Sequence, residues 1–394
     1  MNVYCDNAAT TAIDRDVLEA MMPFLTRYYG NPSSGHFYGQ AVREAIYKAR
    51  ESVALHLNTE PSQIFFTSGA TEALNITLSG VIESYGIQHI ITSPIEHKAI
   101  LETLTQLGKS NKLTVSLVNL DEKGNIDFNH LERLLRFPLK GLVSLMHANN
   151  EIGNLNDLHH IGALCQAFKA LFLSDTTQTI GKIPFDLQTL PVDFVVGSAH
   201  KFHGPKGVGF TYIRETHGFK SLVYGGGQEK GVRPGTENTV GIVGLAKALE
   251  IAYRDLKVNQ KHITLIKNRL LSRLTSAVSG EVRFNGESDS NDKSLYNILN
   301  VAFPNVHSAE SLVSQLNLYG IAVSGGSACS NLNHSHSHVL TALQSNLELE
   351  NVRFSFSKFN TPADVDYILQ SLKNIYHSDR QVYVGRQQSI PVQC

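Results

Sequence analysis

The chain has 394 residues, of which 42% are hydrophobic, and its 34 Lys+Arg nearly balance its 35 Asp+Glu, leaving a formal net charge of -1. A chain of this length and composition can bury large cores, so we expect a globular protein with two lobes. The charge balance gives no bulk electrostatic reason to expect nucleic acid or an anionic membrane as a partner, which favours small molecules and proteins.

The sequence carries no pattern typical of export, membrane insertion or disulfide scaffolds. Its first residues, MNVYCDNAATTAIDRD, contain no basic segment followed by an apolar one, and no apolar run approaches the ~18 residues of a membrane span. We therefore expect a cytoplasmic protein. Cys5, Cys165, Cys329 and Cys394 lie far apart without CxxC spacing, which argues against a disulfide framework and a zinc cluster but not against one reactive thiol.

Short β-branched runs alternate with helical patterns from about residue 13 to residue 250. This alternation predicts an α/β large domain, residues 13–250, with a mostly parallel sheet and helices on its faces. The strand patterns are at residues 63–67, 89–93, 142–147, 170–174, 192–197 and 208–213, and the clearest helical patterns are at 71–85 and 157–170.

The chain changes character after residue 250. One long helical pattern, residues 258–278, precedes strand-like segments at 297–303, 321–330 and 352–359. We expect residues 251–394, together with residues 1–12, to form a smaller α+β domain. Residues 380–394 show no clear period, and we expect them to be loosely held.

The loop after the first expected strand is suited to an anion. Open parallel sheets bind ligands at the carboxyl ends of their strands. Gly69 permits a tight turn there, and Ala70 and Thr71 begin a helix whose free N–H groups suit a phosphate. A helix cap by Ser68 or Thr71 explains the same residues equally well.

Two further strand ends carry Asp175 and Lys201. A poorly solvated lysine can condense with an aldehyde, and a carboxylate that keeps a pyridine nitrogen protonated turns the ring into an electron sink. Alone, the aspartate is typical of a cap or turn, and the lysine of a solvated loop. Together with a phosphate site, they are the three parts that a pyridoxal phosphate enzyme needs.

A series of motifs, found in order, resembles those of the NifS/IscS-type cysteine desulfurases, which are fold-type I pyridoxal phosphate enzymes. They are SGATEALN, SPIEHKAIL, MHANNEIG, DTTQTIGKIPFDL, SAHKFHGPKGVG, GGGQEKGVRPGTEN, SGGSACS and VRFSF, and the match runs from about residue 4 to residue 370. The resemblance implies a seven-stranded, mostly parallel sheet, pyridoxal 5'-phosphate as cofactor, and conversion of L-cysteine to L-alanine.

The resemblance also implies roles for individual residues. Lys201 forms the covalent bond to the cofactor, Asp175 pairs with its ring nitrogen, and Gln178 hydrogen-bonds its phenolic oxygen. His97 stacks on the ring and assists proton transfer, and Asn150 lies near the ring oxygen and the substrate.

Other residues are expected to hold the phosphate and the substrate. Ala70, Thr71, Ser198 and His200 match the phosphate site, and Thr236 matches a threonine contributed by the second subunit of a homodimer. The planar fork of Arg353 binds the substrate carboxylate.

Cys329 carries the sulfur-specific part of the resemblance. The glycines of SGGSACSN allow a mobile loop, about residues 324–338, that brings the thiol to a bound substrate. Attack on the substrate sulfur leaves a persulfide on Cys329 and releases alanine, and the loop then delivers the sulfur to an acceptor or iron–sulfur scaffold protein. A small, packed cysteine is the alternative interpretation.

Several residues depart from the family pattern. Thr176 stands where an alanine usually lies against the cofactor, and Leu173 and Ser174 replace a usual His-Val. Cys394 is expected to be inert. Three histidines would share one face of an extended segment, as metal ligands do, although a loop-to-helix junction is the expected arrangement and no metal is implied. They are His334, His336 and His338.

Two alternatives stay open. A selenocysteine lyase or a cysteine sulfinate desulfinase of the same family would share nearly every residue named above. A non-catalytic sulfur-carrier or scaffold subunit would bind no cofactor and would lose nothing on Lys201→Ala. The pathway served, whether iron–sulfur cluster assembly or the synthesis of a thio-cofactor or thiolated tRNA, is also left open by the sequence.

Overall fold

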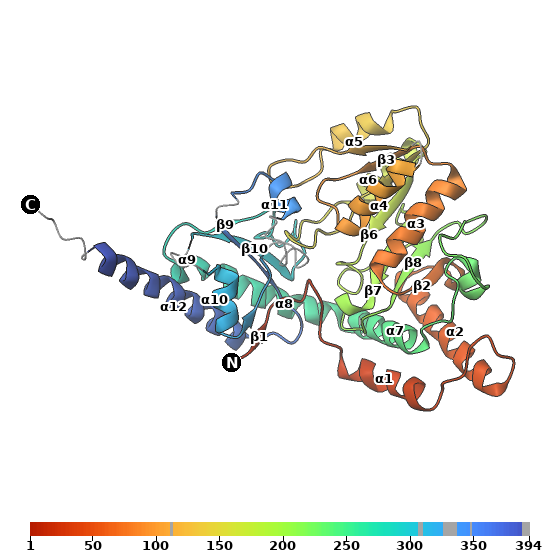
Figure 1. Ribbon diagram of the computed structural model, residues 1–394, viewed down its shortest axis with the longest axis horizontal. Coiled ribbons are helices and arrows are strands. Elements are labelled where there is room, and N and C mark those ends of the chain that lie inside the picture. Colours follow the sequence, from red (N-terminus) through yellow and green to blue (C-terminus); the bar gives the residue numbers. More distant parts are fainter. Residues whose placement is uncertain (111–112, 306–309, 326–336, 347–348, 388–394) are drawn as a thin grey trace, which may run out of the picture.

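The computed structural model describes the whole chain except residues 111–112, 306–309, 326–336, 347–348 and 388–394. Figure 1 shows a large part built around a broad sheet, and a smaller part in which the N-terminal strand lies among C-terminal elements. Within the described residues, no helix is both long enough and apolar enough to cross a lipid bilayer.

The large part contains a seven-stranded sheet in the order β2-β8-β7-β6-β5-β3-β4. Strands β7, β6, β5, β3 and β4 run parallel to one another, whereas β8 is antiparallel to both β7 and β2. The prediction of a mostly parallel seven-stranded sheet is therefore confirmed. The strands are β2 (Ile64–Thr67), β3 (His89–Thr92), β4 (Thr114–Leu117), β5 (Gly141–Ser144), β6 (Leu171–Asp175), β7 (Phe194–Ser198) and β8 (Gly209–Ile213).

Strand β4 was not among the expected strands. It lies at the edge of the sheet, and three of its four residues are exposed. An edge strand has one neighbour and little burial, so its sequence lacks the apolar run that marks the central strands.

Alternate residues of the central strands enter two separate cores. In β7, Val195 packs into the core under α2, α6 and α7, whereas Phe194 and Val196 pack into the core under α3 and α4. Successive side chains of a strand point to opposite faces, so both faces of the sheet are covered. The helices of the large part are α1 (Arg15–Thr26), α2 (Phe37–Leu57), α3 (Ala70–Tyr85), α4 (Lys98–Ser110), α5 (Phe128–Leu135), α6 (Leu158–Ala167) and α7 (Thr239–Arg254).

The smaller part has its own core, which includes Val3 and Cys5 from the N-terminal segment as well as Phe354 and Leu372. Strand β1 pairs in parallel with β11, and β10 lies between β12 and β9 in an antiparallel sheet. The elements are β1 (Val3–Tyr4), α8 (Leu256–Leu271), α9 (Leu274–Ala277), β9 (Arg283–Phe284), β10 (Ile298–Phe303), α10 (Leu312–Leu318), β11 (Ile321–Ala322), α11 (His338–Ala342), β12 (Glu350–Ser355) and α12 (Pro362–Gln387).

The single helix expected at residues 258–278 is two helices, α8 and α9. At the break, the Ser272 hydroxyl donates to the carbonyl of Arg269, and the Ser276 hydroxyl donates to that of Arg273. Serine side chains that compete for backbone carbonyls in this way weaken a helix. Residues 380–387 continue α12 although they show no period, because extending an existing helix requires no further nucleation.

Candidate active site

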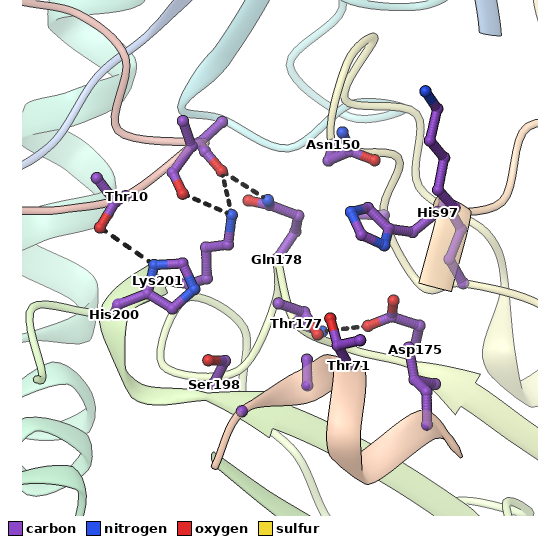
Figure 2. A pocket seen from close by; sticks show the side chains of 18 of the residues that line it. Thr10, Thr71, His97, Asn150, Asp175, Thr177, Gln178, Ser198, His200 and Lys201 are labelled. Atoms are coloured by element: carbon purple, nitrogen blue, oxygen red, sulfur yellow. Dashed lines mark hydrogen bonds between the residues drawn. The ribbon is translucent and has the colours of Figure 1, made fainter. Parts of the chain in front are cut away.

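A cavity of about 510 Å³ opens where the carboxyl ends of β6 and β7 meet the first turn of α3 (Figure 2). Its walls also include the N-terminal segment and β12 of the smaller part. Most residues expected at the site line this one cavity: Ala70, Thr71, His97, Asn150, Asp175, Gln178, Ser198, His200, Lys201 and Arg353.

Asp175 and Lys201 reach the cavity from adjacent strands. Asp175 is the last residue of β6 and is buried, and it pairs in parallel register with Val196 of β7. Strand β7 ends at Ser198, and a single turn of 3-10 helix, Ala199–Lys201, carries the lysine. Parallel strands place their carboxyl ends at one edge of the sheet, so the carboxylate and the amine enter the same space.

The Lys201 amine donates to the backbone of the N-terminal segment. Its Nζ lies 2.6 Å from the carbonyl oxygen of Ala8 and 2.8 Å from that of Ala9. Dashed lines mark the hydrogen bonds of the Lys201 amine in Figure 2. Gln178 donates to the same Ala8 oxygen from its Nε2, at 3.0 Å. The amine is therefore held by backbone carbonyl groups. Every residue has such a group, so the sequence gives no sign of this contact.

A second lysine lies behind this wall. Lys182 donates from Nζ to the Gln178 carbonyl at 2.8 Å. Burial, reinforced by the positive charge of Lys201, lowers the pKa of Lys182 to about 7. Two amines that share a poorly solvated region oppose one another's protonation.

The first turn of α3 is open to an anion. Its N-cap is Gly69, which supplies no side-chain cap, so the alternative in which Ser68 or Thr71 caps the helix is not what the structure has. Gly209 of β8 packs so closely below that a Cβ there would lie 2.8 Å from the Gly69 Cα. Backbone N–H groups, the Thr71 and Ser198 hydroxyls and the dipole of a 16-residue helix thus converge at one corner of the cavity.

His200 lies at the same corner in its neutral form. Burial, together with the positive charge of Lys201, lowers the pKa of His200 to about 4. Its Nδ1 lies 3.1 Å from the Thr10 hydroxyl, a contact drawn in Figure 2.

Five buried polar atoms of residues that line the cavity have no hydrogen-bond partner within the described residues: Glu151 Oε1, Thr177 Oγ1, Gln178 Oε1, His338 Nδ1 and Arg353 Nε. Thr177 also donates its backbone N–H to Asp175 Oδ1 at 2.9 Å. Unsatisfied buried polar atoms are rare in folded proteins, and their gathering around one cavity indicates a polar ligand. Thr177 was not among the expected site residues, since a threonine next to an aspartate has no distinctive signal.

Arg353 is almost fully buried, and much of its guanidinium is already engaged. Nη2 donates to Asp6 Oδ1 at 2.7 Å and to the Ser324 hydroxyl at 3.1 Å, and Nη1 donates to the Asn150 carbonyl at 2.7 Å. Asp6 therefore positions the arginine, a pairing between residues far apart in the chain that the sequence did not predict. The fork of Arg353 is held rigidly at the wall it shares with Asn150.

Two histidines line the cavity from other elements. His97 precedes α4, and its Nδ1 accepts the backbone N–H of Ala99 at 3.1 Å. Burial lowers the pKa of His97, with the positive charge of Lys201 acting in the same direction. His338 begins α11, so this member of the histidine run lies at a loop-to-helix junction.

Some expected residues lie elsewhere. Thr236 is exposed and does not line the cavity of its own chain. Cys329, His334, His336 and Cys394 lie outside the described residues, as does most of the expected loop 324–338. Among the residues that are described, no group of three or more His, Cys, Asp and Glu side chains is arranged to hold a metal ion.

The unusual residues near Asp175 point away from the cavity. The Thr176 hydroxyl is buried and donates to the Val196 carbonyl at 2.7 Å, and Thr176 does not line the cavity. Ser174 donates to the Leu145 carbonyl at 2.9 Å, and Leu173 packs in the core under α3 and α4.

A family model described as "Aminotransferase class-V" matches residues 3–368. A protein named cysteine desulfurase IscS from Dictyoglomus turgidum is 37% identical over 390 residues, which make up 98% of this chain and 97% of the relative. A protein of the same name from Vibrio cholerae is 40% identical over 380 residues, or 94% of this chain and 92% of the relative.

Solved structures agree. One described as a NifS-like protein superposes with a TM-score of 0.87 at 40% identity, covering 96% of this chain and 100% of the other. Another, described as SspA in complex with cysteine, has a TM-score of 0.79 at 30% identity and covers 91% of this chain and 100% of the other.

Proposed function

This chain belongs to the aminotransferase class-V family, and we propose that it is a cysteine desulfurase that converts L-cysteine to L-alanine and retains the sulfur as a persulfide on Cys329. The observation that supports this best is the meeting of Asp175, Lys201 and Arg353 at one cavity, in a chain 37–40% identical to proteins named cysteine desulfurase. The reaction is inferred from the similarity to these relatives, and the side chains that line the cavity are suited to it.

The cavity suits pyridoxal 5'-phosphate as the cofactor. The open first turn of α3, with Ala70, Thr71, Ser198 and His200 around it, would hold the phosphate. Asp175 would pair with the ring nitrogen, and Lys201 would supply the amine that binds the cofactor covalently. The unpartnered Gln178 Oε1 and Thr177 Oγ1 mark the same space as one built for a polar ring.

When bound, the cofactor draws electrons from the substrate. Arg353 and Asn150 orient the carboxylate of cysteine, and the Lys201 amine moves a proton at the α-carbon. The Cys329 thiolate attacks the substrate sulfur; the new S–S bond forms as the C–S bond breaks, and the electron pair of that bond stays with carbon, which becomes the methyl group of alanine after protonation.

We also propose a homodimer. Apolar side chains of α1, α2 and the turn between them are exposed on one chain: Leu18, Met22, Leu25, Tyr29 and Phe37. Such a patch is typical of an interface between subunits. Thr236, which is exposed and outside the cavity of its own chain, would then reach the site of the partner.

The remaining proposals concern partners and location. The protein would pass its sulfur to an acceptor or iron–sulfur scaffold protein, and it would work in the cytoplasm. Cys5 and Cys165 are free, buried thiols, which suits a reducing compartment.

The experiment that tests the function measures alanine and persulfide formed from L-cysteine by the holoenzyme and by Cys329→Ala. We expect the variant to keep the visible absorbance of the lysine-bound cofactor and to bind cysteine, but to form neither product. Cys394→Ala is the control, and it should keep full activity. Undiminished turnover in Cys329→Ala would remove the proposed nucleophile, and a wild-type protein without cofactor absorbance would favour a non-catalytic carrier.

A further inference from the structure

Two of the three histidines that line the cavity, His97 and His338, are fixed in opposite hydrogen-bonding roles. Each ring uses one nitrogen for a backbone contact, and that contact decides what the other nitrogen can do. His97 and His338 therefore offer different chemistry to a ligand, although both are imidazoles that line the same cavity.

His97 presents a donor. Its Nδ1 accepts the N–H of Ala99 at 3.1 Å, so this nitrogen carries a lone pair and no proton. A neutral imidazole then has its single proton on Nε2. Burial favours the neutral form by lowering the pKa of His97.

His338 presents an acceptor. Its Nε2 lies 2.9 Å from the backbone carbonyl oxygen of Glu96, and because a carbonyl only accepts, Nε2 must carry the proton. The lone pair is left on Nδ1, which is buried and has no hydrogen-bond partner within the described part of the chain. An unsatisfied acceptor in a cavity wall is available to a ligand that brings a proton.

The position of His338 is set by the start of α11. The Ser337 hydroxyl accepts the N–H of Leu340 at 3.2 Å as the N-cap and donates to the Glu151 carboxylate. The next two residues, Val339 and Leu340, are buried against Ile95 and Ile152. The His338 ring is thus positioned by the Ser337 cap at the start of α11 and by the hydrogen bond from Nε2 to the Glu96 carbonyl.

The groups of a bound cysteine can be matched to this wall. Its carboxylate suits the guanidinium of Arg353, and its amino group suits the neighbourhood of Lys201. The remaining polar group is the thiol, whose S–H can only donate to an acceptor. Neither the amine of Lys201 nor the donor nitrogen of His97 fills that role. The unpartnered acceptors of the wall are Glu151 Oε1, Thr177 Oγ1, Gln178 Oε1 and His338 Nδ1. Of these, His338 Nδ1 belongs to an imidazole, the side chain best suited to take up a proton near neutral pH.

Building on the proposed function, we infer that His338 Nδ1 accepts the hydrogen bond of the substrate thiol and takes its proton as the sulfur is transferred. The S–H bond breaks with its electron pair left on sulfur, and an N–H bond forms on Nδ1. The imidazolium so formed keeps its other proton on Nε2, which still donates to the Glu96 carbonyl. The carboxylate of Glu151, bound to the adjacent Ser337, lies beside the start of α11 and favours that positive charge.

This arrangement selects among the substrates that the sequence left open. A thiol is largely protonated at neutral pH and can donate to Nδ1. A selenol is largely ionised and a sulfinate carries only acceptor oxygens, so neither donates to His338 Nδ1. The structure therefore favours L-cysteine over both analogues through a single ring nitrogen.

The test compares a ligand that has the thiol with one that lacks it. In the holoenzyme, His338→Gln and His338→Ala should each lower kcat/KM for L-cysteine roughly tenfold to a hundredfold, because a buried hydrogen bond and its proton acceptor are lost. The Kd of L-alanine, which has the carboxylate and amine but no thiol, should change by less than about twofold when followed through the cofactor absorbance. Thr341→Ala removes a 2.8 Å hydrogen bond to the Ser337 carbonyl within the same short helix, and should change neither quantity.

The outcomes separate the two proposals. Equal losses for cysteine turnover and alanine binding, or no loss in either variant, overturn the role of His338. If one variant fails to fold, the other gives the same comparison. A wild-type enzyme that forms no alanine from cysteine contradicts the proposed function itself, whatever the variants do.

Discussion

The two walls of the cavity are built in different ways. The wall from the large sheet places Asp175 and Lys201 at the ends of neighbouring parallel strands, and the backbone there is fixed by the β6–β7 pairing. The opposite wall is assembled from segments that are distant in the chain: Asp6 pairs with Arg353 at 2.7 Å, and the carbonyl of Glu96 holds His338. The first wall derives its geometry from secondary structure, and the second from individual side-chain contacts. Substitutions at the first wall should therefore lower the rate of turnover, whereas substitutions at the second should weaken the binding and orientation of the substrate.

The largest expected effect is at the sheet wall. Lys201→Ala should abolish the visible absorbance of the lysine-bound cofactor and lower alanine formation by at least ~10³–10⁴-fold, since the amine is both attachment point and proton carrier. Lys261→Ala, an exposed lysine of α8, is the control and should keep wild-type activity. Turnover within tenfold of wild type would show that the sheet wall does not carry the chemistry.

The large part of the molecule should also lose stability in acid. Burial lowers the pKa of His147, next to β5, from 6.5 to about 4. Between these values the unfolded chain binds more protons than the folded one, so the free energy of unfolding falls as the pH is lowered. Between pH 7 and pH 4.5 the loss from His147 should be about 2–3 kcal/mol, measured by urea unfolding. His147→Asn should remove that share of the pH dependence, and an unchanged pH profile in the variant would contradict the assignment.

A conservative change at the opposite wall should separate binding from turnover. Arg353→Lys keeps the positive charge but loses the planar fork that holds both Asp6 and the Asn150 carbonyl. We expect KM for L-cysteine to rise about tenfold with kcat within about threefold of wild type, measured by steady-state kinetics. A fall in kcat with unchanged KM would place Arg353 with the residues of the sheet wall.

The smallest effect is expected at Thr176. Its hydroxyl donates to Val196 at 2.7 Å and the residue does not line the cavity. Thr176→Ala should lower the free energy of unfolding by about 1 kcal/mol, the value of one hydrogen bond, and should change kcat/KM less than twofold. A larger change in kcat/KM would mean that the packing behind Asp175 affects the reactivity of the bound cofactor.

The sequence predicted the sheet wall better than the opposite wall for a physical reason. Lys201 and Asp175 each follow an apolar run, and the end of such a run marks the end of a buried strand in the sequence. Asp6 and Ala8 have no such signal, because one acts through a contact with a residue at the other end of the chain and the other through its backbone carbonyl.

His338 illustrates the same limit. Its spacing of two from His336 suggested a shared face, whereas the side chain is oriented by the carbonyl of Glu96, which any residue could provide. Strand β4 was missed because an edge strand buries little. Contacts made through backbone atoms do not require a particular residue type, so they can be found in the structure but not in the sequence.

The N-terminal segment connects the smaller part of the molecule to the Lys201 amine. Residues Val3–Tyr4 pair with β11, and a few positions later Ala8 and Ala9 carry the carbonyl oxygens that meet the Lys201 amine. A short length of backbone thus links the carbonyl groups that hold the reactive nitrogen to a strand of the smaller part. A shift of that strand would move these two carbonyl groups and so change the hydrogen bonding of the Lys201 amine.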